Sequence, residues 1–308
     1  MTALILLVVL IAGGAGYWSW ASQCVANGAS AWGFVVGAPI AYLAPVVCLV
    51  AIWFALSWIW RTPRPPEARL GIAGSLRLFA NEVRTVAVSW PAMALHRLFM
   101  HDPEGVPARR PVILVHGVLV NDGVWFWFRR RLTRLGIGPV YTINLTPPYA
   151  GIDHFARQLA ARIEEVCAET GAQRVALVGH SMGGLVARAY LREAGARRLE
   201  CVVTIGTPHH GSVLAWMWVG RALAQMRPGN AWLAELNSKE AEPLPVPLTS
   251  IWSRHDSMVA PQASSELARA NNVAIVGVGH NALLTDIQVV HGVAHDLCAT
   301  PGSVPRQP

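Results

Sequence analysis

The pattern of hydrophobic and polar positions divides the chain into an apolar front and a regularly alternating remainder. Two long apolar segments occupy about residues 2–20 and 34–60, with a short polar turn at 22–30 between them. Each segment is long enough to cross a bilayer as a helix, which needs about 20 apolar residues. Tryptophans near the segment ends are typical of membrane–water interfaces. The pattern therefore predicts an N-terminal transmembrane helical hairpin.

A second interpretation makes the first apolar segment a cleaved signal peptide. Residues 2–20 lack a basic start, and no clear small-residue cleavage site follows them. The hairpin is therefore the favoured interpretation, and the signal peptide stays open as its alternative.

Beyond residue 110, short apolar runs alternate with stretches of helical spacing. The predicted strands cover residues 112–115, 140–143, 175–178, 201–205, 248–252 and 273–276. Continuous apolar runs are typical of parallel strands that are buried on both faces. Alternation with helices predicts an α/β fold, a mostly parallel sheet with helices on both faces. Catalytic residues are then expected at the carboxyl ends of the strands.

The segment between these two parts begins with a proline-rich break at residues 62–66. Residues 67–100 have partly helical apolar spacing, which fits an amphipathic helix on the membrane or a cover on the core; both remain open. Pro91 is expected to interrupt this helix. The predicted organisation is a membrane region at 1–60, a linker and amphipathic segment at 61–110, and a catalytic domain at 111–300.

Charge is distributed very unevenly along the chain. The first 60 residues contain no Asp, Glu, Lys or Arg. Five arginines follow the second apolar segment closely: Arg61, Arg64, Arg69, Arg77 and Arg84. By the positive-inside rule they lie in the cytoplasm, and the domain that follows them is expected there too.

Composition narrows the partners. The formal net charge is +7, which fits either a basic face toward anionic lipid headgroups or general solubility. No basic cluster is interleaved with aromatic residues, so nucleic acid is not an expected partner. The five cysteines have no metal-ligand spacing, and neither a metal nor a cofactor is expected.

The strongest candidate for chemistry is the sequence Gly179-His180-Ser181-Met182-Gly183. It follows the predicted strand 175–178 and precedes a helix-compatible stretch, which is the context of a sharp turn that presents a nucleophile. A serine hydroxyl also needs a base and donors for the oxyanion. We therefore predict Ser181 as the nucleophile; the alternative is a tight turn without catalytic function.

Candidates for the other roles follow later strands. His280 follows the last predicted strand, and Asp256 is the only acidic residue between Glu242 and Glu266. We predict His280 as the base and Asp256 as the carboxylate that orients it, although a loop aspartate also forms Asx-turns. The backbone N–H groups of Met182 and Val118 are the predicted oxyanion hole. His209 and His210 follow the predicted strand 201–205, so they are expected near the site, and we interpret them as loop structure.

From about residue 111 to 296 the chain resembles the α/β-hydrolase superfamily, and in particular bacterial lipases and triacylglycerol-lipase-like esterases. The matching motifs are residues 115–118, 179–184, 206–212, the Asp256 loop and residues 279–281. The resemblance implies the α/β-hydrolase fold and the order Ser, Asp, His for the triad. It does not cover residues 1–100, and the charge-free hairpin differs from secreted lipases.

Together these features predict a membrane-anchored serine hydrolase in a bacterial inner membrane, with its catalytic domain in the cytoplasm. Its expected substrates are carboxylic esters, lipid or long-acyl esters in particular. Residues 211–240 include an apolar stretch around Trp216 and Trp218, which is a candidate lid or simply packs on the sheet. Two alternatives remain: an acyltransferase with the same triad, and a non-catalytic hydrolase-like membrane module.

Overall fold

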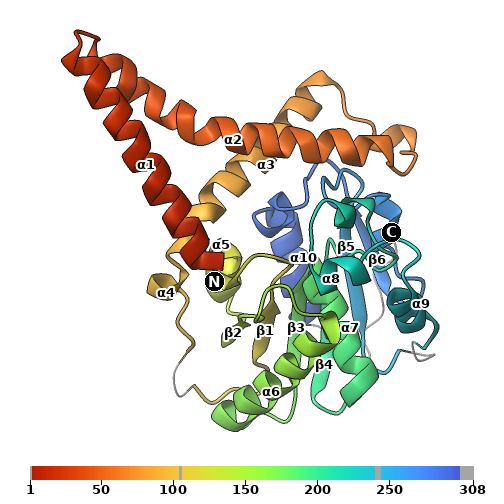
Figure 1. The fold of residues 1–308 in the computed structure, drawn as a ribbon. Helices are drawn as coiled ribbons and strands as arrows, with labels where there is room; N and C mark the ends of the chain where they lie inside the picture. The colour runs from red at the N-terminus through yellow and green to blue at the C-terminus, as the bar shows by residue number, and fades with distance from the viewer. Residues whose placement is uncertain (1, 104–105, 240–243, 299–308) are drawn as a thin grey trace.

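The protein is a six-stranded α/β unit from which two long N-terminal helices project as the arms of a V (Figure 1). The computed structural model describes residues 2–103, 106–239 and 244–298. The strands are β1 (Val112–Val115), β2 (Val140–Ile143), β3 (Val175–His180), β4 (Leu199–Ile205), β5 (Leu248–Ser253) and β6 (Asn271–Ile275). The helices are α1 (Thr2–Ala26), α2 (Ala31–Ile59), α3 (Ile72–Ala94), α4 (His96–Phe99), α5 (Phe126–Arg134), α6 (Ile152–Thr170), α7 (Met182–Ala194), α8 (Arg221–Gln225), α9 (Ala231–Ser238) and α10 (Ile287–Cys298).

The sheet is parallel throughout and has the order β2-β1-β3-β4-β5-β6. Successive side chains of a strand point to opposite faces, and β1 divides its residues between two cores accordingly. Ile113 and Val115 join a cluster with α6 and α7, whereas Val112 and Leu114 join one with α5 and α10. The predicted α/β fold with helices on both faces is therefore confirmed.

The strand order reverses direction at β1. The chain leaves β1 toward β2 on one side and returns to β3 on the other, so β1 and β3 are neighbours. Loops that leave the carboxyl ends of such neighbouring strands diverge and open a crevice between them. The predicted oxyanion loop follows β1, and the predicted nucleophile follows β3.

The N-terminal helices are longer than the predicted segments, and among their described residues only those of α2 contribute side chains to a buried cluster with α3. Helix α1 continues six residues beyond the expected end at residue 20, and α2 spans residues 31–59. Both are long and apolar enough to cross a membrane, a test that a signal sequence also passes. The carboxyl half of α2 lies across the α/β unit (Figure 1), where Val46, Val50 and Trp53 are buried in a cluster with α3.

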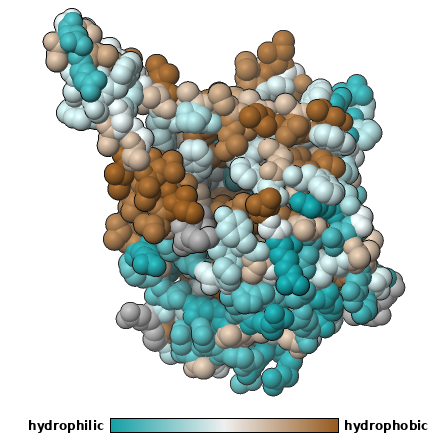
Figure 2. Space-filling view, viewed as in Figure 1, coloured by the Kyte–Doolittle hydropathy of each residue, from teal (hydrophilic) through white to brown (hydrophobic). Residues whose placement is uncertain are grey.

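Helix α3 covers the core rather than standing apart from it. It packs against α1, α2 and the short 3₁₀ helices that follow β1 and precede α10. The expected interruption at Pro91 was wrong, because the proline lies in the last turn and the helix ends only at Ala94. Hydrophobic side chains concentrate on the half of the molecule with α1 to α3, and hydrophilic ones on the half around α6 (Figure 2).

Candidate active site

Ser181 is the single residue that connects strand β3 to helix α7. Its backbone has φ 55° and ψ −124°, a conformation with a positive φ that serine rarely adopts. The Ser181 N–H donates to the carbonyl of Ile205 at 2.9 Å, which ties the turn to β4. Backbone strain of this kind persists only where the surroundings enforce it, and it is concentrated at functional sites.

Two glycines make this turn possible because other backbone lies directly against them. A Cβ on Gly183 would lie 2.1 Å from the carbonyl oxygen of Val115, and a Cβ on Gly179 would lie 2.5 Å from the nitrogen of Gly184. Both distances are far below van der Waals contact. Any side chain here would push α7 away from the sheet and displace Ser181.

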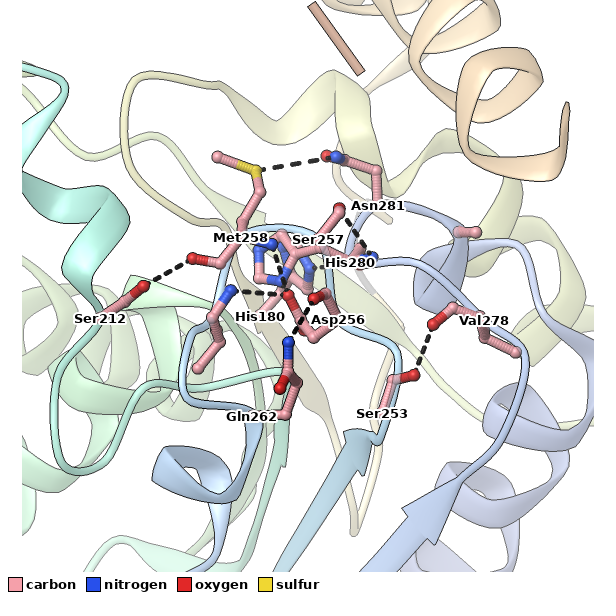
Figure 3. A network of polar contacts seen from close by, with 12 residues as sticks. His180, Ser212, Ser253, Asp256, Ser257, Met258, Gln262, Val278, His280 and Asn281 are labelled. Atoms are coloured by element: carbon pink, nitrogen blue, oxygen red, sulfur yellow. Dashed lines mark hydrogen bonds and ion pairs between the residues drawn. The ribbon is translucent and has the colours of Figure 1, made fainter. Parts of the chain in front are cut away.

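His280 and Asp256 meet where the loops after β5 and β6 run together (Figure 3). The Nδ1 of His280 lies 2.9 Å from Oδ2 of Asp256, and both side chains are almost fully buried. The other carboxylate oxygen of Asp256 accepts the N–H groups of Met258 at 2.8 Å and Val259 at 2.7 Å. The loop therefore holds the carboxylate in one orientation, and the carboxylate holds the imidazole.

Two carboxylates near His280 raise its pKa above the usual value. Burial lowers the pKa of His280, but the charge and hydrogen bond of Asp256 and the charge of Glu82 outweigh burial and raise it. The ring of His180 lies 4.6 Å from the His280 ring, centroid to centroid. Burial lowers the pKa of His180 well below its usual value, so His180 is neutral.

The loop after β1 lies against Ser181. A Cβ on Gly117 would lie 3.1 Å from the Cβ of Ser181, so the two residues are packed closely together. His116 holds the loop: its Nδ1 donates to the Gly117 carbonyl at 2.8 Å, and its Nε2 accepts the Leu145 N–H at 3.0 Å. Val118, the residue after Gly117, lines a cavity together with Ser181.

Met182, the other predicted oxyanion residue, is the first residue of α7. The N–H groups in the first turn of a helix have no acceptor within the helix, and they carry the positive end of its dipole. Met182 directly follows Ser181, so its N–H belongs to the same turn. Ser181, Val118 and His280 thus line one cavity, and Met182 directly follows Ser181 in the chain.

One residue of this region, Glu82, was not among the residues predicted from the sequence. Glu82 of α3 has no exposed surface, and its Oε1 accepts Ser257 Oγ at 2.8 Å and the Asn281 N–H at 3.0 Å. Its Oε2 accepts the Ala282 N–H at 2.9 Å. The carboxylate therefore joins the Asp256 loop to the His280 loop. A signal was available, since Glu82 lies three residues after Phe79, on the apolar face of the helix.

His209, which follows β4, has a structural role. His209 is fully buried and contacts Arg188, Thr204 and Ser250. Burial, reinforced by the charge of Arg188, lowers the pKa of His209 well below its usual value. This agrees with the interpretation of His209 as loop structure.

Ser181 and His280 line a cavity of about 390 Å³ whose walls are mostly apolar. Its walls include side chains from each of the three N-terminal helices: Ile5 and Leu6 of α1, Leu49 and Trp53 of α2, and Val86, Trp90 and Met93 of α3. Leu214, Trp218 and Leu223, which lie between β4 and α9, also line the cavity. The apolar N-terminal helices thus form part of the wall of the candidate active site.

Sequence comparisons point to lipases. Residues 153–296 match the family described as the PGAP1-like alpha/beta domain. The chain is 39% identical over 115 residues to a triacylglycerol lipase of Pseudarthrobacter phenanthrenivorans, covering 35% of each protein. A triacylglycerol lipase of Vibrio cholerae is 30% identical over 146 residues, which cover 46% of this chain and 43% of that lipase. The matched region thus spans less than half of either relative.

Structural comparisons establish the fold. Lipase B of Aspergillus fumigatus aligns with a TM-score of 0.63 at 17% identity, over 85% of this chain and 82% of that one. The mature lipase BlEst2 of Bacillus licheniformis aligns with a TM-score of 0.55 at 20% identity, over 64% and 95%. The chain therefore has the α/β-hydrolase fold, and the predicted resemblance to lipases and esterases is confirmed.

The contacts of Glu82 generate a prediction about His280. In Glu82→Gln the negative charge that raises the pKa of His280 is lost, so this pKa falls and protonation of the imidazole begins at lower pH. Charged hydrogen bonds are also lost, which lowers the free energy of unfolding by about 1.5–3 kcal/mol. Imidazole NMR shifts across a pH titration measure the first effect, and denaturant unfolding the second.

Glu67→Gln is the matched control, because Glu67 is exposed and lies outside this region. It should change neither quantity. An unchanged or higher His280 pKa in Glu82→Gln would contradict the electrostatic contribution of this carboxylate.

Proposed function

We propose that the protein is a membrane-anchored serine hydrolase that cleaves carboxylic esters with long acyl chains, lipid esters among them. The observation that carries this proposal is the pairing of the buried Asp256 with His280, on the cavity that Ser181 also lines. A serine in a strained turn, a histidine and an orienting carboxylate are the components of a catalytic triad. The lipases among its relatives support the same reaction class.

In the proposed mechanism, Ser181 Oγ attacks the ester carbonyl while its proton passes to His280 Nε2. Asp256 holds Nδ1 protonated and stabilises the imidazolium that forms. The backbone N–H groups of Val118 and Met182 receive the negative charge on the carbonyl oxygen. The intermediate collapses, the bond to the alcohol breaks, and His280 protonates the departing alkoxide. Water activated by His280 then releases the acid and restores Ser181.

The walls of the cavity support an acyl chain as the group bound beside Ser181. When an acyl chain covers the apolar side chains of α1, α2 and α3, the free energy falls by about 25 cal/mol for each Å² removed from water. A short acetyl group would leave most of this surface uncovered. Long-acyl esters are therefore the proposed substrates.

Residues 211–240 remain a proposed lid, of which residue 240 lies outside the described residues. Trp216 is 63% exposed and Val219 is 79% exposed, whereas Trp218 and Leu223 line the cavity. An apolar segment with one side on the cavity and the other in solvent fits a cover that opens onto lipid. Arg227 stacks over the Trp216 ring at 4.1 Å.

We also propose that residues 1–60 anchor the enzyme in a bacterial inner membrane with the catalytic domain in the cytoplasm. In the most apolar window of each helix, none of α1 and 11% of α2 is buried in the protein. An apolar surface of this size in water would be costly, and a bilayer would cover it. The arginines after residue 60 support the cytoplasmic orientation.

The first prediction concerns the nucleophile. Ser181→Ala should lose covalent labelling by a fluorophosphonate probe and lower kcat/KM for nitrophenyl butyrate by roughly 1000-fold or more, because the attacking oxygen is gone. Ser238→Ala, an exposed serine of α9, is the control and should behave as wild type. Labelling that persists in Ser181→Ala would refute the assignment.

The second prediction concerns acyl-chain length. The wild type should hydrolyse nitrophenyl decanoate with a higher kcat/KM than the acetate. Leu49→Trp fills the cavity from α2, so it should lower kcat/KM for the decanoate by about tenfold and leave the acetate nearly unchanged. Val47→Trp is the matched control on the exposed side of α2. Equal losses for both esters, or a wild-type preference for acetate, would argue for an ordinary esterase.

The third prediction concerns topology. Alkaline phosphatase, which is active only in the periplasm, should be inactive when fused after Pro308 and active when inserted at Asn27 between the two helices. The five arginines that follow α2 are the physical reason. An active fusion after Pro308 would overturn the cytoplasmic assignment.

A further inference from the structure

A second cavity, of about 650 Å³, lies where α2 ends and the chain turns toward α3. We call it the arginine cavity, because Arg61, Arg64 and Arg69 line it. His255, which precedes the triad aspartate in the sequence, lines it as well. It is separate from the cavity of Ser181 and His280, with which it shares no lining residue.

The charges of the arginine cavity are not balanced. None of the described residues that line it is Asp or Glu. The Arg61 guanidinium lies 3.8 Å from the ring centroid of Trp58, and that of Arg64 lies 5.5 Å from the same ring. Burial lowers the pKa of Arg64, and the nearby charge of Arg61 lowers it further. Two like charges are therefore held close together, where an anion would relieve their repulsion.

His255 contributes a buried donor without a partner. Its Nδ1 accepts the Gly277 N–H at 3.2 Å, so in the neutral ring the proton is on Nε2. His255 is only 2% exposed, and its buried Nε2 has no hydrogen-bond partner among the described residues. Burial and the charges of Arg64 and Arg254 lower the pKa of His255 to about 4. An unpaired buried donor costs free energy, which a bound acceptor would recover.

The remaining wall of the cavity is apolar. Phe54 of α2 and Leu70, Leu78 and Phe79 before and within α3 line it. Trp58 and Trp60 mark the end of the apolar helix α2, a position typical of a membrane interface. The cavity therefore combines a positively charged part with an apolar part at the end of the apolar helix α2.

We propose that the arginine cavity binds an anionic phospholipid, with its phosphate on the arginines and His255 Nε2 and its acyl chain along Phe54 and Phe79. The proposal rests on the membrane anchoring proposed above, but it requires no ester hydrolysis. Arginine is suited to phosphate because its guanidinium presents several N–H donors in one plane. Anionic lipids are also attracted to basic residues beside a membrane helix.

The test uses the full chain with Ser181→Ala, in neutral detergent, so that the lipid cannot be hydrolysed. Isothermal titration with dihexanoyl phosphatidylglycerol should show binding, whereas dihexanoyl phosphatidylcholine and inorganic phosphate should bind much more weakly. Arg61→Gln with Arg69→Gln should weaken binding of the phosphatidylglycerol by about tenfold or more. Arg77→Gln with Arg84→Gln is the matched control, because it removes two exposed charges of α3 outside the cavity.

Equal affinity for phosphatidylcholine would overturn the proposal, and equal affinity for inorganic phosphate would overturn the lipid as occupant. Equal losses in the two double variants would do the same, since they would show a general charge effect. A second readout does not depend on the variants. Saturation with phosphatidylglycerol should raise the pKa of His255, measured by NMR, and an unchanged pKa would contradict the proposed contact.

Discussion

The hydrogen bonds of the buried Glu82 carboxylate are the interaction on which the candidate active site depends. A carboxylate without water must be satisfied entirely by protein donors, and Glu82 obtains them from the loops after β5 and β6. It thereby joins α3 to the loops of Asp256 and His280. The position of the histidine is thus coupled to a helix outside the sheet, which itself packs against the two apolar N-terminal helices.

This coupling gives the N-terminal region more than one role. Helix α2 packs on α3, contributes Leu49 and Trp53 to the wall beside Ser181, and leads into the arginine cavity at its end. The linker that follows it returns to the Asp256 loop, where Thr62 N–H donates to Gln262 and Gln262 donates to the Asp256 carbonyl. A segment that composition marks as an anchor is therefore also part of the structure around the candidate site.

Strain and electrostatics at the site follow from the same sheet. The reversal of strand order brings the loops after β1 and β3 together. Ser181 has a positive φ in this turn, and the backbone of β1 leaves room only for glycine at position 183. The loops after β5 and β6 bring an aspartate and a histidine to the same edge. Burial would favour a neutral imidazole, but the two nearby carboxylates reverse this effect and raise the pKa of His280.

Local sequence patterns determined much of this protein. Apolar runs such as 112–115 and 175–178 predicted the parallel sheet, because a strand that is buried on both faces is mostly apolar. Ser181, Asp256 and His280 could be proposed because each follows a predicted strand, and parallel strands end at one edge. Only the tertiary structure decided the contacts of Glu82, the path of α2 and the arginine cavity. Those contacts join residues up to about 200 positions apart, and such pairs leave no periodicity in the sequence.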